Sequence, residues 1–528
     1  MKSAGVDAWK RINELWSGNI IINIKEISED TVNVSDDVSM SNESYLSHNP
    51  RIKLALELLD KIPFKRSNET LNSKLSKELD SVLLTAINRI SPHWIRAAQE
   101  FPFLFDFNLR VNLMRTVCLG PFRALTALHS RLLGNNNNNP NQGSAPSIPR
   151  HKFRIDRANF MKCLRHVFAS VNDGDFRSFE FEYIDELGTG HGPTMEFYAL
   201  ASKEICRPSL GLMHVTRPGN LEADEIIEAE GEGLFPSWTT EDNRNSDLFR
   251  ILGSLVARAL LDDRIIDIPL HPIFLSTGSV QFKDLEFIDS DLFAVLSDET
   301  KMVGNGITFN VPGSEIQLVP GQERTINTLV DLEEFQGLLM KRINEKLTCA
   351  RDSFLQGFNS TFPESFEVMS SFFPLSDLVR LIGPSRFSSD SDWSVPVIRS
   401  ALITDHGYRP DSPQITWLAE LLSEAPGNSE RTKLVRFLTG AAYLPVGGWG
   451  SLRPPLTIVC KTFSTEDPGN ESSASLTSSS NAENHDAYLP SVMTCANYLK
   501  LPRYSSKQIM KERLEYAVRE GFGSFYLS

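Results

Sequence analysis

The sequence has few cysteines and no recognisable metal-binding pattern. Its six cysteines are widely scattered, with no C-x-x-C pair and no histidine partners at zinc-finger spacing. This scatter argues against a zinc site or a disulfide framework, so we expect no metal and no cofactor. Unpaired thiols are typical of reducing compartments, which predicts a location in the cytoplasm, the nucleus or both.

Long apolar runs and an excess of positive charge are also missing. No apolar run approaches the roughly 18 residues that a membrane span requires. Residues 1–10 lack the apolar core of a secretory signal. The formal net charge is −14, which argues against broad binding to a phosphate backbone. We therefore expect neither a membrane nor a nucleic acid among the partners.

The composition that remains is typical of a soluble globular protein, with 41% hydrophobic and 23% charged residues among 528. A chain of this length can form about two to four domains, each with its own core. Composition and periodicity predict five regions: a poorly ordered N-terminal segment (1–50), a helical extension (51–134), a low-complexity linker (135–150), a large mixed unit (151–408) and a small C-terminal unit (409–528).

Apolar periodicity predicts helices and strands within these regions. The expected helices cover 71–90, 109–133 with a break near Gly120, 248–262, a segment that begins at Pro413, and a last segment that ends at Gly521 after a capping box of Ser505 and Gln508. The expected strands lie at 179–183, 307–311, 316–318 and 456–460. Residues 405–413 contain one glycine and two prolines, which predicts a flexible connection. Residues 464–487 are rich in Ser, Asn and Glu and are expected to form a disordered insertion.

The most informative feature is Cys495, in the tract Leu-Pro-Ser-Val-Met-Thr-Cys-Ala-Asn-Tyr-Leu-Lys-Leu-Pro that spans 489–502. It is expected between a strand and the last helix, and a loop position suits an exposed nucleophile. The other cysteines are expected to pack in the core. Gly188, Gly190 and Gly192 do not fit G-x-G-x-x-G, so they predict a tight turn rather than a phosphate cradle.

Several separated tracts resemble those of HECT-type ubiquitin-protein ligases, in the order of that family. Besides the cysteine tract they are 186–198, 233–236, 405–408, 444–452, 455–458 and the terminal Gly-Ser-Phe-Tyr-Leu-Ser of 523–528. This terminus and Pro-Phe-Leu-Phe at 102–105 are most similar to the thyroid-receptor-interacting and ubiquitin-fusion-degradation subfamily. The similarity runs from about Phe101 to Ser528. The repeat-rich N-terminal half of that subfamily is absent, so we expect a fragment, a short paralogue or a truncated gene model.

The resemblance implies an α+β fold, in which a helical extension precedes a bilobal HECT domain. The N-lobe (151–408) would be large and mainly helical, and the C-lobe (409–528) a small α/β unit. A subdomain at roughly 270–345 would recruit the ubiquitin-conjugating enzyme, and a hinge near 406–412 would swing the C-lobe between donor and substrate. The implied partners are ubiquitin, the conjugating enzyme and protein substrates, whose lysines would be modified for proteasomal degradation.

The same resemblance assigns roles to residues of this chain. Cys495 would be the nucleophile that holds ubiquitin as a glycyl thioester. Phe525, the fourth residue from the end, matches the aromatic residue of the family's tail. Around the thiol, Thr494 is a candidate to hydrogen-bond near the sulfur and Asn497 a candidate to fix the loop. Asp486 is a candidate carboxylate that orients and deprotonates the attacking lysine.

The sequence differs from the family pattern in two ways, and two other functions were considered. Many HECT enzymes have a histidine two residues before the nucleophile, where this chain has Met493, and His485 lies at the edge of the insertion. A papain-like protease needs a histidine downstream of its cysteine, and residues 496–528 contain none. A catalytically inactive HECT-like interaction scaffold remains the alternative, because only an assay of Cys495 separates it from an active ligase.

Overall fold

A computed structural model describes the regular part of the chain. The described residues are 69–81, 90–133, 148–171, 175, 177–186, 190–215, 233–240, 245–264, 266–321, 323–383, 393–425, 427–440, 444, 448–452, 454–461, 485–494 and 497–521. All of them belong to one compact unit, Leu54–Ser528. The predicted N-terminal segment (1–50), the low-complexity linker at 135–147 and the insertion at 464–484 lie outside the described residues.

Helices make up most of the described structure, and small sheets complete an α+β fold. The α-helices are α3 (Glu69–Leu79), α5 (Pro92–Glu100), α6 (Phe107–Cys118), α7 (Gly120–Leu133), α8 (Phe160–Ser170), α9 (His191–Ile205), α10 (Ser246–Asp262), α11 (Pro272–Leu275), α12 (Leu285–Ile288), α13 (Ser290–Leu296), α14 (Glu299–Met302), α15 (Leu329–Thr361), α16 (Phe366–Ser370), α17 (Leu375–Ile382), α18 (Val395–Ala401), α19 (Pro413–Ser423), α20 (Gly427–Thr439) and α21 (Lys507–Gly521). No helix in the described ranges is both long enough and apolar enough to cross a membrane.

The strands form two separate sheets. They are β1 (Arg150–Ile155), β2 (Ser178–Tyr183), β3 (Ile403–Asp405), β4 (Thr457–Cys460), β5 (Ser491–Met493) and β6 (Tyr498–Leu501). The first sheet pairs β1 with β2 in parallel. The second has the order β3-β4-β6-β5, in which only β5 runs antiparallel to its neighbour.

The helices α3 to α7 contact the following unit through a buried arginine. Arg110 on α6 is 4% exposed and donates to the Phe372 carbonyl at 3.0 Å and to Asp377 at 2.5 Å. Its guanidinium also lies 5.7 Å from the ring centre of Phe107 and 5.5 Å from that of Phe373. A buried guanidinium needs such partners because its desolvation is costly. Helix α6 is therefore tied to α17 by a specific polar contact as well as by apolar packing.

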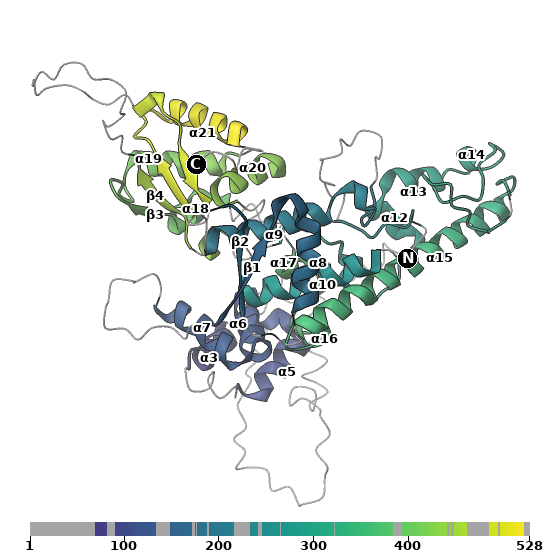
Figure 1. Ribbon diagram of the computed structural model, residues 1–528, viewed down its shortest axis with the longest axis horizontal. Helices are drawn as coiled ribbons and strands as arrows, with labels where there is room; N and C mark the ends of the chain where they lie inside the picture. Colours follow the sequence, from purple (N-terminus) through teal and green to yellow (C-terminus); the bar gives the residue numbers. More distant parts are fainter. Residues whose placement is uncertain are drawn as a thin grey trace, which may run out of the picture. The chain divides into compact units, whose positions relative to one another are not determined.

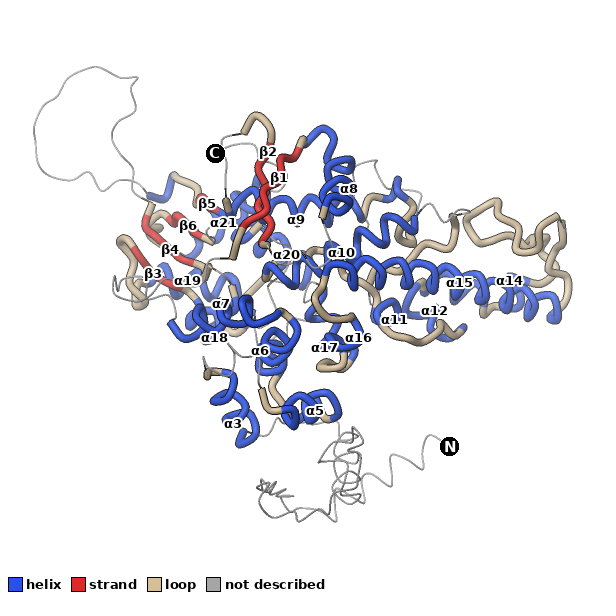
Figure 2. Tube along the Cα trace, turned by 60° about the horizontal axis from the view of Figure 1, so that its bottom comes forward, coloured by secondary structure: helices blue, strands red, loops and turns tan. Residues whose placement is uncertain are grey.

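The core of the large unit is the crossing of α10 and the 33-residue helix α15. The two helices approach most closely at Gly253 and Gly357, where Ser254 donates from Oγ to the Gly357 carbonyl at 2.9 Å. Both views show α15 extending from this crossing toward α14, so one helix links the core to the segment that contains α12 to α14 (Figures 1 and 2).

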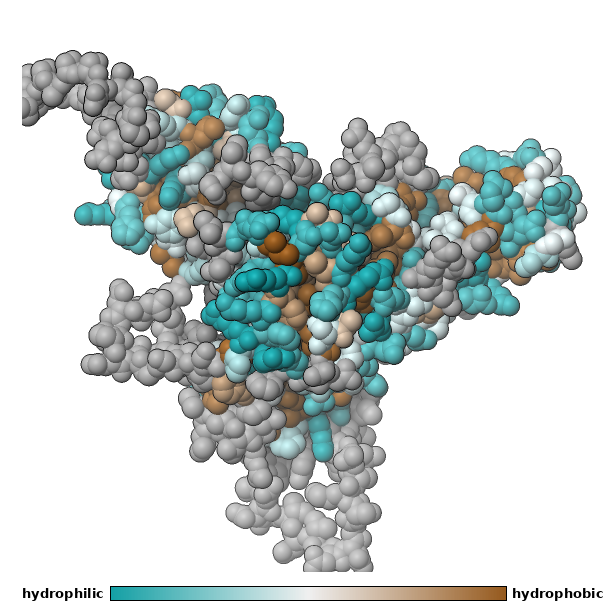
Figure 3. Space-filling model, in the orientation of Figure 1, coloured by the Kyte–Doolittle hydropathy of each residue, from teal (hydrophilic) through white to brown (hydrophobic). Residues whose placement is uncertain are grey.

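The β1–β2 pair carries a row of charged side chains, of which Glu180 on β2 is itself buried. Arg150 and Lys152 on β1 contact Glu180 and Glu182 on β2, with N–O distances of 3.0 to 3.7 Å. Hydrophilic residues accordingly cover much of this part of the surface in the space-filling view (Figure 3). The alternate side chains Phe179, Phe181 and Tyr183 of β2 are buried, as the period-two pattern of the sequence predicts.

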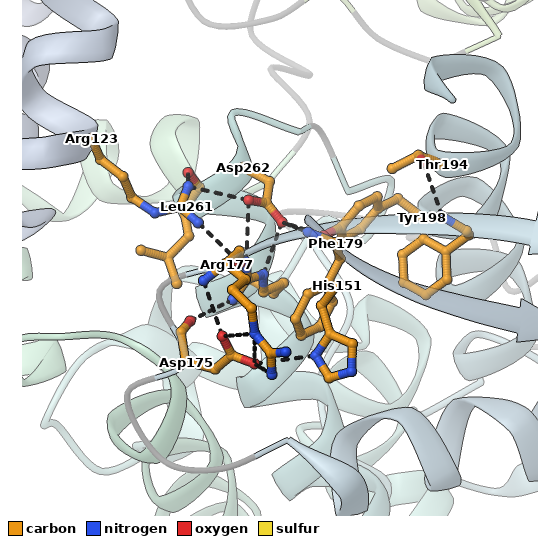
Figure 4. A network of polar contacts seen from close by, with 11 residues as sticks. Arg123, His151, Asp175, Arg177, Phe179, Thr194, Tyr198, Leu261 and Asp262 are labelled. Carbon is orange, nitrogen blue, oxygen red and sulfur yellow. Dashed lines mark hydrogen bonds and ion pairs between the residues drawn. The ribbon is translucent and has the colours of Figure 1, made fainter. Parts of the chain in front are cut away.

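A buried polar network joins α7, α10 and the start of β2 (Figure 4). Asp262 is 1% exposed and pairs with Arg258 at 2.8 Å and with Arg123 at 3.2 Å. It also accepts from Tyr198 Oη at 3.3 Å and from the Phe179 amide at 3.4 Å. Burial lowers the pKa of Arg123, and the charge of Asp262 acts against that shift. One carboxylate thus neutralises two buried guanidinium groups.

The C-terminal unit begins before the predicted boundary at 408/409. Its hydrophobic core contains Trp393, Ile398 and Tyr408 together with residues of α19, β4, β6 and α21. Strand β3, at Ile403–Asp405, pairs in parallel with β4 and forms one edge of the sheet. The position predicted for the boundary, 408/409, therefore falls inside a packed cluster that begins by Trp393.

The hinge predicted near 406–412 is wrong. Tyr408 is 6% exposed, and its hydroxyl donates to the carbonyls of Leu501 and Pro502 at 3.2 and 2.9 Å. Gly407 has a φ of +97°, and a Cβ there would lie 2.8 Å from the Cβ of Cys460. This segment is a surface turn that Tyr408 anchors to the core, so its Gly and Pro residues specify backbone conformation rather than mobility.

The strongly periodic segments were predicted correctly. Helix α10 and strand β2 have nearly the expected bounds, the helix starting at Pro413 is α19, and α6 and α7 are separated at the expected break near Gly120. The strands predicted at 307–311 and 316–318 are reduced to isolated bridges, Thr308 with Thr325 and Asn310 with Gln317. Their alternation reflects the burial of Phe309 and Val311 rather than a continuous ladder.

Candidate functional site

The cysteine tract forms the connection between the antiparallel strands β5 and β6. Met493 pairs with Tyr498 across these strands, so the chain reverses within 494–497. Cys495 and Ala496 lie outside the described residues, but their flanking residues Thr494 and Asn497 are described. Strand β5 is the edge of its sheet. The residues that flank Cys495 are therefore held at the edge strand of this sheet.

Asn497 anchors one side of this connection. It is 2% exposed and has a left-handed φ of +47°, a conformation that Asn tolerates better than most residues. Its Nδ2 donates to the Pro454 carbonyl at 2.6 Å, its own carbonyl accepts from Thr457 at 2.9 Å, and its amide donates to the Thr494 carbonyl at 3.2 Å. These contacts fasten the residue after Ala496 to the start of β4. Pro454 was not expected in the site, because it contributes only a main-chain carbonyl that no side-chain pattern reveals.

Thr494 lies on the other side of the connection and is half-buried. Its Cβ faces the end of α20 at Gly440. Met493, at the position where many family members carry a histidine, is 49% exposed on the edge strand. His485 belongs to the turn His485–Ala487 at the opposite end of β5. The structure therefore does not bring His485 to the position that Met493 occupies.

Asp486, the candidate carboxylate for lysine attack, bonds in the structure to the residues that precede α21. Its two oxygens accept from the amide and from the hydroxyl of Ser505, at 2.8 and 2.6 Å. These bonds lower the pKa of Asp486, and its main-chain carbonyl accepts from Arg513 at 2.8 Å. The carboxylate fixes the approach to α21. The capping box predicted from Ser505 is consequently replaced, since the Oγ of Ser506 accepts from the Ile509 amide at 3.3 Å.

Two of the other cysteines are unsuited to nucleophilic chemistry. Cys118 and Cys206 are each 1% exposed, and burial, with a smaller effect of Glu364 or Asp267, raises the pKa of each thiol to about 12. They remain protonated at neutral pH and pack in the core. Phe525 lies outside the described residues. No cluster of three or more metal-ligating side chains occurs in the part of the chain that the structure describes.

Comparison with known proteins identifies a family whose match includes the cysteine tract. Residues 199–528 match the model of the HECT-domain (ubiquitin-transferase) family. The chain is 32% identical over 496 residues to a probable ubiquitin fusion degradation protein of Schizosaccharomyces pombe, with 88% of this chain and 28% of the relative aligned.

Two further relatives are similar over the same region. Ubiquitin fusion degradation protein 4 of Saccharomyces cerevisiae is 33% identical over 87% of this chain and 32% of its own length. The E3 ubiquitin-protein ligase TRIP12 of Danio rerio is 33% identical over 87% of this chain and 24% of its own length. The chain thus spans about a quarter to a third of the length of these relatives. Because the family model covers more than half of the chain and includes the cysteine tract, this chain belongs to the HECT-domain family of ubiquitin transferases.

Proposed function

We propose that this chain is a ubiquitin-protein ligase that works through a thioester on Cys495. The thiolate attacks the thioester carbonyl of ubiquitin on the conjugating enzyme, and the thiolate of that enzyme leaves. A substrate lysine amine then attacks the new thioester, loses a proton and displaces the Cys495 thiolate, which leaves an isopeptide bond. The observation that carries this proposal is the position of Cys495 in a short β5–β6 connection, within the family match and at the edge strand of the sheet.

The residues around the connection support positioning rather than strong chemical activation. The exchange of one thioester for another is close to energy-neutral, so correct placement of the thiol can supply most of what the first step needs. Asn497, through its bonds to Pro454 and Thr457, provides such placement. Its Oδ1 is buried and has no donor among the described residues. An acceptor thus remains available to the adjacent residues of the connection.

The conjugating enzyme is proposed to dock on the segment at roughly 270–345. In this segment Leu285 and Ile288 are buried, while Phe287 is 51% exposed and Val295 is 41% exposed. The apolar residues of this segment therefore divide into buried ones, which pack in the core, and exposed ones. Exposed apolar side chains on short helices are suited to a transient protein contact.

The C-terminal unit is proposed to move between donor and substrate. Because the packed core of this unit begins by Trp393, the moving connection must precede that residue. We further propose that the chains assembled on substrates direct them to proteasomal degradation in the cytoplasm or nucleus. The names of the yeast relatives, ubiquitin fusion degradation proteins, support a role in degradation.

Replacement of Cys495 by serine tests the proposed nucleophile. The wild-type chain, incubated with activating enzyme, conjugating enzyme and ubiquitin, should form an adduct that a reductant cleaves. Cys495→Ser should give either no adduct or one that resists the reductant, because an oxygen ester replaces the thioester. Adduct formation is followed on non-reducing and reducing gels. Cys460→Ser, which alters a half-buried cysteine of β4, is the matched control and should retain the reductant-sensitive adduct. If the wild-type chain forms no adduct, it is instead the interaction scaffold.

Replacement of Phe525 by alanine tests the role of the terminal tail. We expect transfer of ubiquitin from Cys495 to lysine to slow by about tenfold to a hundredfold, as is typical when a positioning group is lost. The urea midpoint of unfolding should stay unchanged. Single-turnover discharge of the preformed adduct to free lysine measures the transfer step separately from loading. Discharge at the wild-type rate would remove Phe525 from the mechanism.

A further inference from the structure

The carboxyl end of α20 meets the residue that precedes Cys495. Gly440 follows Thr439, the last residue of α20, and has a left-handed φ of +80°. Its amide donates to the Arg436 carbonyl at 2.8 Å, which closes the last turn of the helix. Glycine is favoured in this conformation at a helix end because it has no Cβ. The helix-stop role of Gly440 could be predicted from sequence, but its neighbour could not.

The neighbour of Gly440 is the Thr494 side chain. A Cβ built on Gly440 would lie 3.4 Å from the Thr494 Cβ, 3.7 Å from its Oγ1 and 3.9 Å from its Cγ2. These are ordinary van der Waals distances, so an alanine would just fill the gap. Any larger side chain that points the same way must displace Thr494 or α20.

Displacement of Thr494 requires less movement than displacement of the helix. On α20, Val435 and Leu438 are buried in the core of the C-terminal unit, and the Thr439 hydroxyl donates to the Val435 carbonyl at 2.8 Å. On the far side of the connection, Asn497 is fixed to Pro454. Only residues 494–496 lie between Met493, which pairs with Tyr498, and Asn497. A shift of Thr494 is therefore passed to the next residue, Cys495, and cannot be spread over a longer loop.

We propose that Gly440 is a positioning residue for the Cys495 thiol, because it lets α20 end directly against Thr494. This inference rests on the proposed role of Cys495. It predicts a steric relationship: the larger the side chain at 440, the further the thiol moves from the place where it meets an incoming thioester. Misplacement by about 1 Å can reduce a reaction rate by about a hundredfold.

Gly427 at the start of the same helix is a matched control. It also has a left-handed φ, +69°, but a Cβ there would meet no atom within 4 Å. Alanine, asparagine and leucine are introduced in turn at each position. The backbone strain of a non-glycine residue should be similar at the two sites, because both have a left-handed φ, whereas contact with Thr494 occurs only at 440.

The experiment measures the single-turnover rate of adduct formation at saturating conjugating enzyme charged with ubiquitin, together with the urea midpoint of each variant. At 440 we expect a loss of less than threefold for alanine and of about tenfold to a hundredfold for leucine. At 427 all three variants should remain within threefold of wild type. Gly440→Leu should lower the rate less in a Thr494→Ala background than in the wild type, because the smaller side chain at 494 makes room for leucine.

The outcomes distinguish the two proposals. If the wild-type chain forms no adduct, the proposed function fails irrespective of Gly440. If the wild type is active but the 440 and 427 series lose rate in parallel, or lose it only in proportion to stability, Gly440 has no positioning role. The absence of any rescue by Thr494→Ala would likewise overturn the inference, since the contact with Thr494 is its physical basis.

Discussion

Replacement of Gly357 by alanine is expected to lower the free energy of unfolding by about 3 to 5 kcal/mol. At the crossing of α10 and α15, a Cβ on Gly357 would overlap the carbonyl oxygen of Arg250, and a Cβ on Gly253 would overlap that of Phe354. Both obstacles are main-chain atoms of rigid helices, so no side-chain rotation relieves the overlap. The helices must separate, which also breaks the bond from Ser254 to the Gly357 carbonyl. A domain of ordinary stability has only about 5 to 15 kcal/mol in total.

Replacement of Gly337 by alanine should instead raise the free energy of unfolding. Gly337 lies on an exposed part of α15, and a Cβ there would meet no atom within 4 Å. Alanine should stabilise the helix at this position by about 0.5 to 1 kcal/mol, because it restricts the unfolded chain and favours the helical state. Urea unfolding followed by circular dichroism measures both variants. Equal effects of Gly357→Ala and Gly337→Ala would contradict the close approach of the two helices.

Periodicity was sufficient to predict the elements that bury one continuous face. The stripe of α10 and the alternation in β2 identified both elements because each buries its apolar positions against the core. The helix starting at Pro413 was equally clear, since a proline in the first turn fits a helix start. These features depend on neighbouring residues and can therefore be predicted locally.

Long-range pairing could not be predicted in the same way. Strand β3 is three residues long, and its only strand neighbour in the sheet is β4, which begins more than 50 residues later. Nothing in Ile-Thr-Asp distinguishes it from a loop. The adjacent glycine and prolines were interpreted as a flexible connection because the contacts of Gly407 with Cys460, and of Tyr408 with Leu501, are distant in sequence.

In the candidate site, too, some residues could be predicted from the sequence and others could not. The tract around Cys495 pointed to the nucleophile through its resemblance to a family, and Asn497 was suggested as the residue that fixes the loop. Asp486 was chosen by proximity in sequence alone, and the structure shows that Ser505 occupies both of its oxygens. The partners of the flanking residues, Pro454 and Gly440, act through a carbonyl and through the absence of a side chain. Neither leaves a chemical signature in the sequence.

Replacement of Asp262 by asparagine is expected to lower the free energy of unfolding by about 3 to 5 kcal/mol, the range observed when one member of a buried ion pair is removed. Asparagine has nearly the same shape and can still accept from Tyr198 and from the Phe179 amide. It carries no charge, however, and its amino group would face the guanidinium of Arg258, which is fully buried. Two positive groups, Arg258 and Arg123, would then share a buried site without a counter-charge.

Asp263 offers a control that differs by one position in the chain. Its side chain is 61% exposed and pairs with Arg115, itself partly exposed. Its φ of +55° is left-handed, which asparagine tolerates. Asp263→Asn should therefore change the free energy of unfolding by less than about 1 kcal/mol, as is usual for exposed ion pairs.

Since Arg123 belongs to α7, the Asp262→Asn variant should also loosen this helix. Hydrogen exchange of α7 amides should rise more in Asp262→Asn than in Asp263→Asn. If both variants unfold at the same urea concentration, charge neutralisation by Asp262 does not hold α7 against α10.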